Sequence, residues 1–361
     1  MVENFSIEPN PSPLDRHARE AALQDPGFGK AFTDHMVTIE WDEQSGWHNA
    51  RVRPRGPFEI DPASSVLHYA QEVFEGMKAY RLVDGGLGLF RPEENARRFA
   101  ESARRLAMPE LPVPLFLEAV AQLVSIDSAW VPEGSASLYL RPFMFSNEAF
   151  LGVRPAKRYT FCIIACPAGA YFKVGDAAID LWVAPDFSRA APGGTGAAKC
   201  GGNYAASLAA QQQAIAMGCD QVMFLDATEK RWVEELGGMN AFFLFDDRTL
   251  ITPPLTGTIL PGITRQSILE LAGDLGVVAS EQTYAFEQWQ SDAESGRMLE
   301  AFACGTAAVV AGIGSVRFPT GSFQIGDGTC GPMTLSIRER IVGLQRGRES
   351  DDRGWLYRLA E

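Results

Sequence analysis

Residues 194–204 read GTGAAKCGGNY and set one lysine, Lys199, among glycines and alanines directly before a helical stretch. A lysine in such surroundings is partly removed from water, which disfavours its charged form and lowers its pKa. The neutral amine attacks carbonyl carbons, as in Schiff-base formation with pyridoxal 5′-phosphate (PLP). The alternative is a lysine that holds its ammonium group in water, the usual state of this residue. The small-residue surroundings favour the reactive amine.

Composition limits the range of partners. The chain has 361 residues, enough for two domains. Hydrophobic residues make up 46% and charged residues 21%, as in ordinary globular proteins. The formal net charge of −13 argues against nucleic acid or an anionic membrane surface as the main partner. A site for an anionic ligand must therefore come from local arginines and backbone N–H groups.

Targeting segments, disulfides and metal sites are not expected. The six cysteines are scattered without a C-x-x-C pair, which is typical of a reduced, cytoplasmic protein. Residues 1–20 are polar and mixed in charge, unlike a signal or transit peptide. No stretch reaches the roughly 18 apolar residues of a membrane span. The four histidines lie too far apart to predict a zinc site.

Short strand-like runs alternate with helical ones along the chain. Residues 167–176 are rich in glycine and alanine without periodicity, which indicates a domain boundary or a loop that covers a ligand. Residues 229–254 alternate with turn signals, as β-hairpins do. The other patterns predict strands at 32–41, 86–90, 136–144, 159–166, 179–184 and 221–225, core segments at 295–310 and 314–318, and helices at 93–108, 112–128, 203–217, 265–275 and 333–344.

The helix predicted at 93–108 carries a packing face and a group of arginines. Apolar or small residues at 96, 99, 100, 103, 106 and 107 recur at three-and-four spacing and predict the buried face. Arg97, Arg98, Arg104 and Arg105 lie off that face. Guanidinium groups bind phosphate bidentately, but periodicity does not choose Arg98 over its neighbours.

Three further segments offer what a PLP enzyme needs besides a lysine: an acid facing the pyridine nitrogen and a cup for the phosphate. Residues 262–264 lie where a loop enters a helix, which favours an anion; the alternative is a plain helix start capped by Thr264. Glu235 precedes a glycine pair that allows close backbone approach, although an isolated glutamate is usually solvated. Residues 305–307 offer a hydroxyl and backbone donors, or form an ordinary strand-to-turn junction.

Five segments, in order along the chain, carry a resemblance to a known family: 67–80 (LHYAQEVFEGMKAY), 138–142 (LYLRP), the lysine stretch, 235–240 (ELGGMN) and 260–265 (LPGITR). The match begins at 28–36 (FGKAFTDHM) and extends to the C-terminal region. With these segments the chain resembles the branched-chain amino acid aminotransferases, which are fold-type IV (class IV) PLP enzymes.

The resemblance implies PLP as cofactor and a role for each residue around it. Lys199 is the implied Schiff-base lysine and proton shuttle, Glu235 the partner of the pyridine nitrogen, and Tyr204 the partner of the phenolic oxygen. It also singles out one arginine of the helix at 93–108. The residues implied to hold the phosphate are Arg98, the backbone of Ile263 and Thr264, and Thr306.

The implied reaction moves the amino group of L-leucine, L-isoleucine or L-valine to 2-oxoglutarate in two half-reactions. The substrate carboxylate would meet Tyr139 and backbone N–H groups near Thr306 and Ala307. Arg141, with Tyr69 beside it, is the expected host for the distal carboxylate of glutamate; the alternative is an arginine in a structural ion pair. An aromatic pocket suits aliphatic side chains, and its implied members are Phe28, Tyr69, Phe74, Gly76, Tyr171 and Gly238.

The implied fold is α/β (α+β), with a smaller N-terminal α/β domain at 1–168, a connection at 169–178 and a larger C-terminal PLP-binding domain with a β-barrel-like core at 179–361. The cofactor would lie between the domains. The family forms homodimers, in which a loop resembling residues 149–153 reaches the neighbouring pocket and would bring Val153 to the substrate. Mammalian relatives carry a C-x-x-C pair where this chain has AVVA at 308–311, so no thiol switch is expected.

Two other classes of function stay open on the sequence. A D-amino acid aminotransferase or an aminodeoxychorismate lyase shares the implied fold, although the EGMKA segment at 75–79 and the chain length favour the branched-chain type. A binding protein that kept the fold without catalysis is the non-enzymatic alternative.

Overall fold

The computed structural model describes residues 5–169 and 178–359, which group into two compact units. Within these ranges, unit 1 comprises residues 5–169, 198–201 and 343–359, and unit 2 comprises 178–197 and 202–342. The chain therefore returns to unit 1 twice, once around Lys199 and once at the C-terminus. All but the two end residues of the connection expected at 169–178 lie outside the described residues.

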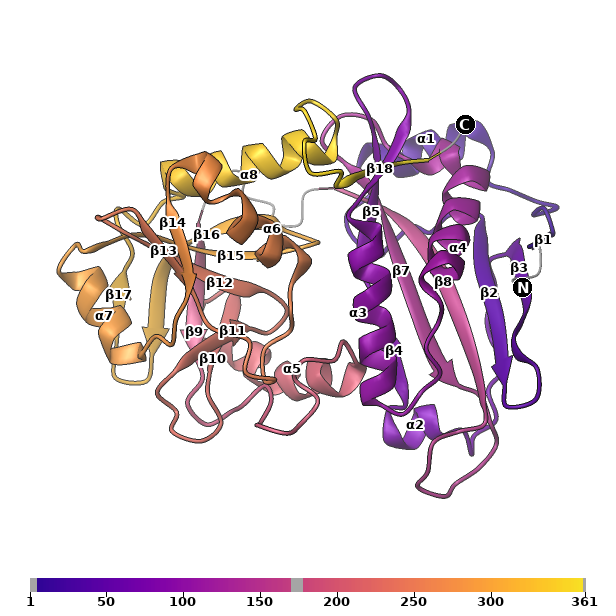
Figure 1. Ribbon diagram of the computed structural model, residues 1–361, viewed down its shortest axis with the longest axis horizontal. Helices are drawn as coiled ribbons and strands as arrows, with labels where there is room; N and C mark the ends of the chain where they lie inside the picture. The colour runs from indigo at the N-terminus through magenta and orange to yellow at the C-terminus, as the bar shows by residue number, and fades with distance from the viewer. Residues whose placement is uncertain (1–4, 170–177, 360–361) are drawn as a thin grey trace. The chain divides into compact units, whose positions relative to one another are not determined.

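Unit 1 is built on one sheet with the strand order β1-β3-β2-β8-β7-β5-β6-β18, in which β4 also pairs with β7 (Figure 1). Neighbouring strands are antiparallel except β1 and β3. The strands are β1 (Ser6–Ile7), β2 (His35–Asp42), β3 (Gly46–Pro54), β4 (Glu72–Phe74), β5 (Met77–Arg81), β6 (Leu87–Phe90), β7 (Ser137–Ser146), β8 (Arg158–Ala168) and β18 (Leu356–Arg358).

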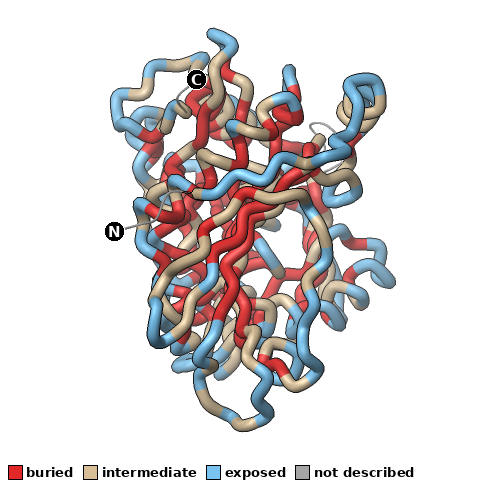
Figure 2. Tube along the Cα trace, turned by 90° about the vertical axis from the view of Figure 1, so that its right-hand side faces the viewer, coloured by how far each residue is buried: buried red, intermediate tan, exposed pale blue. Residues whose placement is uncertain are grey.

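Two helices of unit 1, α3 and α4, pack on one face of this sheet and close its core. Leu138 and Leu140 of β7 belong to that core. Because side chains alternate along a strand, Tyr139 and Arg141 lie on the opposite face. Figure 2 shows buried segments of the trace in the interior and exposed segments mostly at the periphery. The helices are α1 (Arg16–Gln24), α2 (Ser65–Tyr69), α3 (Pro92–Arg105) and α4 (Val113–Ile126), of which α1 and α2 were not predicted.

Helix α3 ends in a left-handed residue, Ala107, whose φ is +53°. The N–H of Met108 donates to the carbonyl of Ala103 (2.9 Å), and that of Ala107 donates to Arg104 (3.1 Å), the Schellman arrangement. The prediction that Ala107 lies on the packed face was wrong: the residue is exposed because the helix has already ended.

Replacing Ala107 with glycine is expected to stabilise the protein by about 1 kcal/mol, because glycine adopts positive φ without a Cβ clash. The measurement is the midpoint of urea unfolding of the full-length chain. The matched control is Ala209→Gly at an exposed position inside helix α5 (Gly201–Ala216), which is expected to cost about 1 kcal/mol. Two shifts of the same sign would contradict the assignment.

Unit 2 contains a closed barrel, as expected for its core. The ring runs β9-β10-β11-β12-β15-β16 and closes because β11 pairs with both β10 and β12. Strands β13 and β14 extend it beside β12, and β17 pairs with β16. The strands are β9 (Ile179–Val183), β10 (Gln221–Leu225), β11 (Val233–Leu236), β12 (Asn240–Phe245), β13 (Thr249–Thr252), β14 (Val278–Glu281), β15 (Met298–Gly305), β16 (Val309–Phe318) and β17 (Gly321–Gln324).

The predicted helices of the second half of the chain are confirmed, with shifted ends. They are α5, α6 (Ile263–Leu271) and α8 (Pro332–Gln345), of which α8 passes into unit 1 at Gly343; α7 (Phe286–Glu294) was not predicted. The start of α8 is capped from β15, where the Glu300 carboxylate accepts from the N–H groups of Met333 (2.9 Å) and Thr334 (2.7 Å). Within the described part of the chain, none of the helices is long and apolar enough to cross a membrane.

Candidate active site

Lys199 lies between two residues that are anchored in the core of unit 1. Ala198 and Cys200 are buried in that core. The N–H of Lys199 donates to Ser102 Oγ (2.9 Å), and its carbonyl accepts from the N–H of Phe74 (2.9 Å). The Nζ atom lies 4.7 Å from the centroid of the Phe74 ring. Backbone contacts on both sides thus fix the lysine, and the residue as a whole is mostly but not completely buried.

The surroundings of Lys199 favour a neutral amine. Burial lowers the pKa of Lys199 to about 8, and the nearby charge of Arg98 acts in the same direction. Glu75 and Tyr139 oppose this shift, and Arg141 adds to it. At pH 7 about a tenth of the amine is therefore unprotonated, far more than for an ordinary lysine, and only this neutral form is a nucleophile.

Arg98 is held by a buried carboxylate. Its Nε and Nη2 atoms donate to the two oxygens of Glu75 at 2.7 and 2.9 Å. Asn95 donates to the same carboxylate at 2.8 Å. The helical periodicity placed Arg98 off the packed face, and this was wrong: its side chain is buried because Glu75 supplies a charge partner inside the unit. Burial raises the pKa of Glu75, but Arg98 and Lys199 outweigh it and hold the value below its ordinary range.

Four of the expected substrate residues gather beside Lys199 in unit 1. The rings of Phe28 and Tyr139 meet edge to face, with centroids 4.9 Å apart. Arg141 donates to the Tyr139 hydroxyl (3.1 Å), and its guanidinium lies over the ring of Phe74 (4.8 Å). The Nε of Arg141 is buried and has no hydrogen-bond acceptor among the residues that the structure describes. Such a donor suits an incoming carboxylate.

Gly76 makes room for the Tyr139 hydroxyl. A Cβ at this position would lie 2.1 Å from the hydroxyl oxygen. We expect Gly76→Ala to displace Tyr139 and to lower kcat/KM for L-leucine about 100-fold, because misplacement of a positioning group by about 1 Å costs that much. The control is Gly56→Ala, where a Cβ meets nothing within 4 Å. Unchanged kcat/KM in the Gly76 variant would exclude Tyr139 from substrate binding.

Tyr69 and Val153 lie at the surface of unit 1. The Tyr69 hydroxyl donates to the carbonyl of Leu151 (2.7 Å), which ties helix α2 to the loop at 149–153. Val153 is 85% exposed, and Leu67, Tyr69, Phe150 and Leu151 are also large exposed hydrophobic residues. Tyr171, expected in the same pocket, lies outside the described residues.

In unit 2, Glu235 is a buried, fully partnered carboxylate. It accepts from the N–H of Leu260 (2.8 Å) and from Asn240 Nδ2 (3.2 Å). It also forms an ion pair with Arg189, whose Nη1 lies 2.8 Å from Oε1. The view of Glu235 as a solvated residue is therefore excluded. A carboxylate held by a guanidinium in this way stays ionised, as the partner of a protonated ring nitrogen requires.

The sequence analysis assigned no role to Arg189 or Asn240. Arg189 also donates to the carbonyls of Gly196 (3.3 Å) and Thr258 (2.9 Å), so it joins the loop before the lysine to the loop before α6. Asn240 donates to the carbonyl of Leu260 (3.0 Å). Asn240 closes the ELGGMN segment and was visible within that motif, whereas Arg189 carried no local signal.

The start of α6 fits the predicted anion cup. Its N-cap is Gly262, and the alternative with Thr264 as the cap is wrong. A Cβ on Gly262 would lie 2.0 Å from Asn240 Oδ1, so this position requires glycine. The first N–H groups of a helix have no acceptor within the helix and attract anions. Ile263 and Thr264 therefore present donors where the sequence placed them.

The remaining expected residues of unit 2 gather around the turn between β11 and β12. A Cβ on Gly238 would lie 3.7 Å from the ring of Tyr204, and one on Gly305 would lie 3.6 Å from the carbonyl of Gly238. Thr306 and Ala307 follow Gly305 in the turn between β15 and β16. Unit 2 thus brings together the acidic partner, the helix start and the threonine turn.

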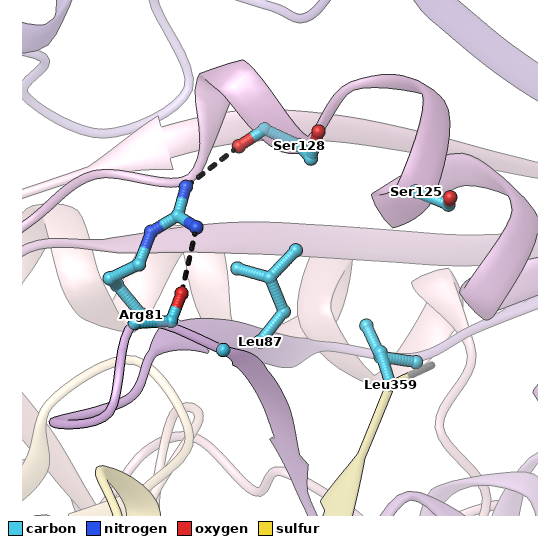
Figure 3. A pocket seen from close by; sticks show the side chains of 7 residues that line it. Arg81, Leu87, Ser125, Ser128 and Leu359 are labelled. Carbon is cyan, nitrogen blue, oxygen red and sulfur yellow. Dashed lines mark hydrogen bonds between the residues drawn. The ribbon is translucent and has the colours of Figure 1, made fainter. Parts of the chain in front are cut away.

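A separate surface pocket of about 230 Å³ lies beside the β5–β6 hairpin of unit 1 (Figure 3). Arg81, in this pocket, donates to the carbonyls of Gly85 (3.2 Å) and Ser128 (3.1 Å), so its guanidinium braces the hairpin. None of the expected site residues lines it. Among the described residues, no group of histidine, cysteine, aspartate and glutamate is arranged to hold a metal ion.

Comparison with known proteins gives consistent matches. A family model described as amino-transferase class IV matches residues 72–316. A branched-chain-amino-acid aminotransferase of Mycolicibacterium smegmatis is 52% identical over 360 residues and covers 98% of each chain. The crystal structure of the Escherichia coli branched-chain amino acid aminotransferase superposes with a TM-score of 0.75 at 30% identity, covering 90% of this chain and 100% of that one. The T.th. branched-chain amino acid aminotransferase with pyridoxamine 5′-phosphate gives a TM-score of 0.74 at 28% identity, covering 90% and 99%.

Proposed function

The chain belongs to the class IV aminotransferases, and we propose that Lys199 carries its reaction, the PLP-dependent transfer of an amino group between branched-chain amino acids and 2-oxoglutarate. The family and the 52% identical relatives support this activity over that of a D-amino acid aminotransferase, a lyase or a silent binder. The observation that carries the residue assignment is the lysine itself: backbone contacts fix it on both sides, and burial lowers the pKa of its amine.

The described residues fit PLP. The cofactor supplies an aldehyde that links to an amine and a protonated ring that withdraws electrons from the bonds at the amino carbon. Lys199 offers the amine, Glu235 the carboxylate for the ring nitrogen, and Tyr204 a hydroxyl for the phenolic oxygen. The proposed phosphate ligands are Arg98, the N–H groups of Ile263 and Thr264, and Thr306.

Lys199 is both nucleophile and base in this proposal. Its amine would link to the cofactor and, once released by the incoming amino group, would move the proton from the substrate Cα to the cofactor carbon. One residue serves both transfers because it stays beside both carbons. Its lowered pKa, which burial and Arg98 cause, favours the neutral amine that must accept the first proton.

The substrate side is assigned to the unit 1 residues around Lys199. Tyr139, with N–H groups near Thr306 and Ala307, would hold the α-carboxylate. Arg141 would hold the distal carboxylate of glutamate through its buried Nε. Its guanidinium plane lies over the ring of Phe74. The aliphatic side chains of the substrates would be bound only by dispersion and by burial of apolar surface against the aromatic rings. The other proposed pocket residues are Phe28, Tyr69, Gly76, Tyr171 and Gly238.

A panel of amino donors with 2-oxoglutarate tests this function. L-leucine, L-isoleucine and L-valine are each expected to give glutamate, measured by an enzyme-coupled assay, and D-alanine is expected to give none. Activity with D-alanine alone would overturn the proposal. Cofactor binding without turnover of any donor would favour the silent binder.

We also propose that the chain forms a homodimer, as the resemblance to the family implies. We propose that the exposed hydrophobic residues at Leu67, Tyr69, Phe150, Leu151 and Val153 are covered by a second copy, whose pocket the loop at 149–153 would complete. Light scattering on the Leu151→Glu variant is expected to show monomers, with loss of activity. Location in the cytoplasm stays a prediction, supported by six cysteines that form no disulfide.

A further inference from the structure

Glu75 has no role in the function proposed above, yet it lies at the centre of the unit 1 site. Its carboxylate is completely buried. It contacts Arg98 through both oxygens (2.7 and 2.9 Å) and is in electrostatic contact with Lys199. A buried carboxylate is costly unless it is paired, and here one carboxylate serves two cations.

The neighbours of Glu75 fix its position. Asn95 of α3 donates to Oε2 at 2.8 Å, and the N–H of Gly76 donates to the same oxygen at 3.0 Å. The next residue on the other side, Phe74, binds the carbonyl of Lys199 through its N–H. The segment 74–76 thus contacts the lysine backbone, the lysine amine and the arginine within three consecutive residues.

We propose that Glu75 is a positioning residue for transamination: its bidentate contact sets the plane of the Arg98 guanidinium, and its charge balances Arg98 and Lys199 together. The inference rests on the proposed function. A guanidinium fixed through Nε and Nη2 has a defined direction for binding an anion, whereas a free side chain would have to be ordered by the ligand. The charge of Glu75 also decides how readily the lysine accepts a proton.

The charged and titratable groups that face Lys199 are Arg98 of α3, Glu75, and Tyr139 and Arg141 of β7. Removing the Glu75 charge removes the carboxylate that opposes Arg98 and Arg141 at Lys199, so the ammonium form of the lysine becomes less favourable. Removing the Arg98 charge does the reverse. A purely structural defect would not shift the pKa of Lys199 in opposite directions in these two variants.

Competitive labelling of the full-length chain without added cofactor tests how the charge of Glu75 acts on Lys199. The rate at which acetic anhydride labels Lys199 is followed against pH by peptide mass spectrometry, because only the neutral amine reacts. The parent midpoint is expected near pH 8. Glu75→Gln is expected to lower it by about one pH unit, Arg98→Met to raise it by a similar amount, and the double variant to restore it.

The same samples contain matched controls. Lys78 is a second lysine whose pKa burial lowers to about 8, with Arg346 acting in the same direction, so its midpoint should stay constant in all variants. Glu101→Gln removes an exposed carboxylate of α3 and should move neither lysine. A Glu75→Gln midpoint that is unchanged or raised would overturn the charge role. If Glu75→Gln does not fold, the other two variants still decide: an Arg98→Met midpoint equal to that of the parent, or a double variant with the same midpoint as Arg98→Met, would overturn it.

Positioning is tested separately with Glu75→Asp, which keeps the charge but shortens the reach. We expect its Lys199 midpoint to stay near that of the parent, while its Kd for pyridoxamine 5′-phosphate, which binds without a bond to the lysine, rises about tenfold. An unchanged Kd would overturn the positioning role. If the donor panel shows transamination and these shifts are absent, only this inference fails; if no donor reacts, the proposed function fails.

Discussion

Lys199→Ala is expected to abolish transamination, lowering kcat by about 10⁴-fold or more, because the same amine is proposed to bind the cofactor covalently and to move both protons. The variant should also lose the absorbance of the covalently bound cofactor. Its fold should survive, since Ser102 and Phe74 hold the backbone of residue 199 and Ala198 and Cys200 hold its core contacts. Absorbance spectra, kcat and the urea midpoint are the measurements.

Lys78→Met is the matched control for this prediction. Burial lowers the pKa of Lys78 to about 8, as it does for the candidate nucleophile, but the charge that adds to this shift is Arg346 and not Arg98. Borohydride treatment fixes the cofactor on its lysine as a stable secondary amine, which peptide mapping locates. We expect the adduct on Lys199 in the parent and in the Lys78 variant. An adduct on Lys78, or a yellow and active Lys199→Ala variant, would refute the central assignment.

Glu235→Gln is expected to lower kcat at least about 100-fold, the size of effect that loss of a single electrostatic contact in an active site produces. A neutral amide no longer holds a proton on the ring nitrogen, so the ring withdraws electrons less strongly. The change also leaves Arg189 buried without its charge partner, which costs about 3–5 kcal/mol of stability. Both kcat and the urea midpoint should therefore fall.

The double variant Glu235→Gln/Arg189→Met separates these two effects. Removing both members of a buried pair is far less destabilising than removing one. We expect the double variant to recover much of the urea midpoint while kcat stays low. Recovery of kcat together with stability would mean that Glu235 acts only on the fold, and not on the cofactor ring.

Local pattern was sufficient to predict much of the fold. Helical periodicity predicted α3 and α4, and the hairpin signals of residues 229–254 predicted the region of β11, β12 and β13. The lysine stretch, the glycine before α6 and the ELGGMN turn each carried a visible motif. These predictions succeed because a helix face, a turn or a helix start is determined by residues a few positions apart.

Two of the three failed predictions depended on a residue far away along the chain. Ala107 was expected to be packed, but the helix ends before it; Arg98 was expected on the open face, but Glu75, 23 positions away, pairs with it in the core. Thr264 gave way to Gly262 as the cap because Asn240 occupies the space that a side chain there would need. In the last two cases the deciding contact comes from another element.

The sequence by itself determined most of the order of elements, the family and the lysine that we propose as the reactive residue, since each is written in contiguous residues. Only the tertiary structure decided that the lysine segment joins unit 1, that Glu75 holds Arg98 and that Arg189 holds Glu235. The physical reason is that a buried charge must find an opposite charge wherever packing brings one within reach, and that partner is set by how strands and helices assemble and not by spacing along the chain.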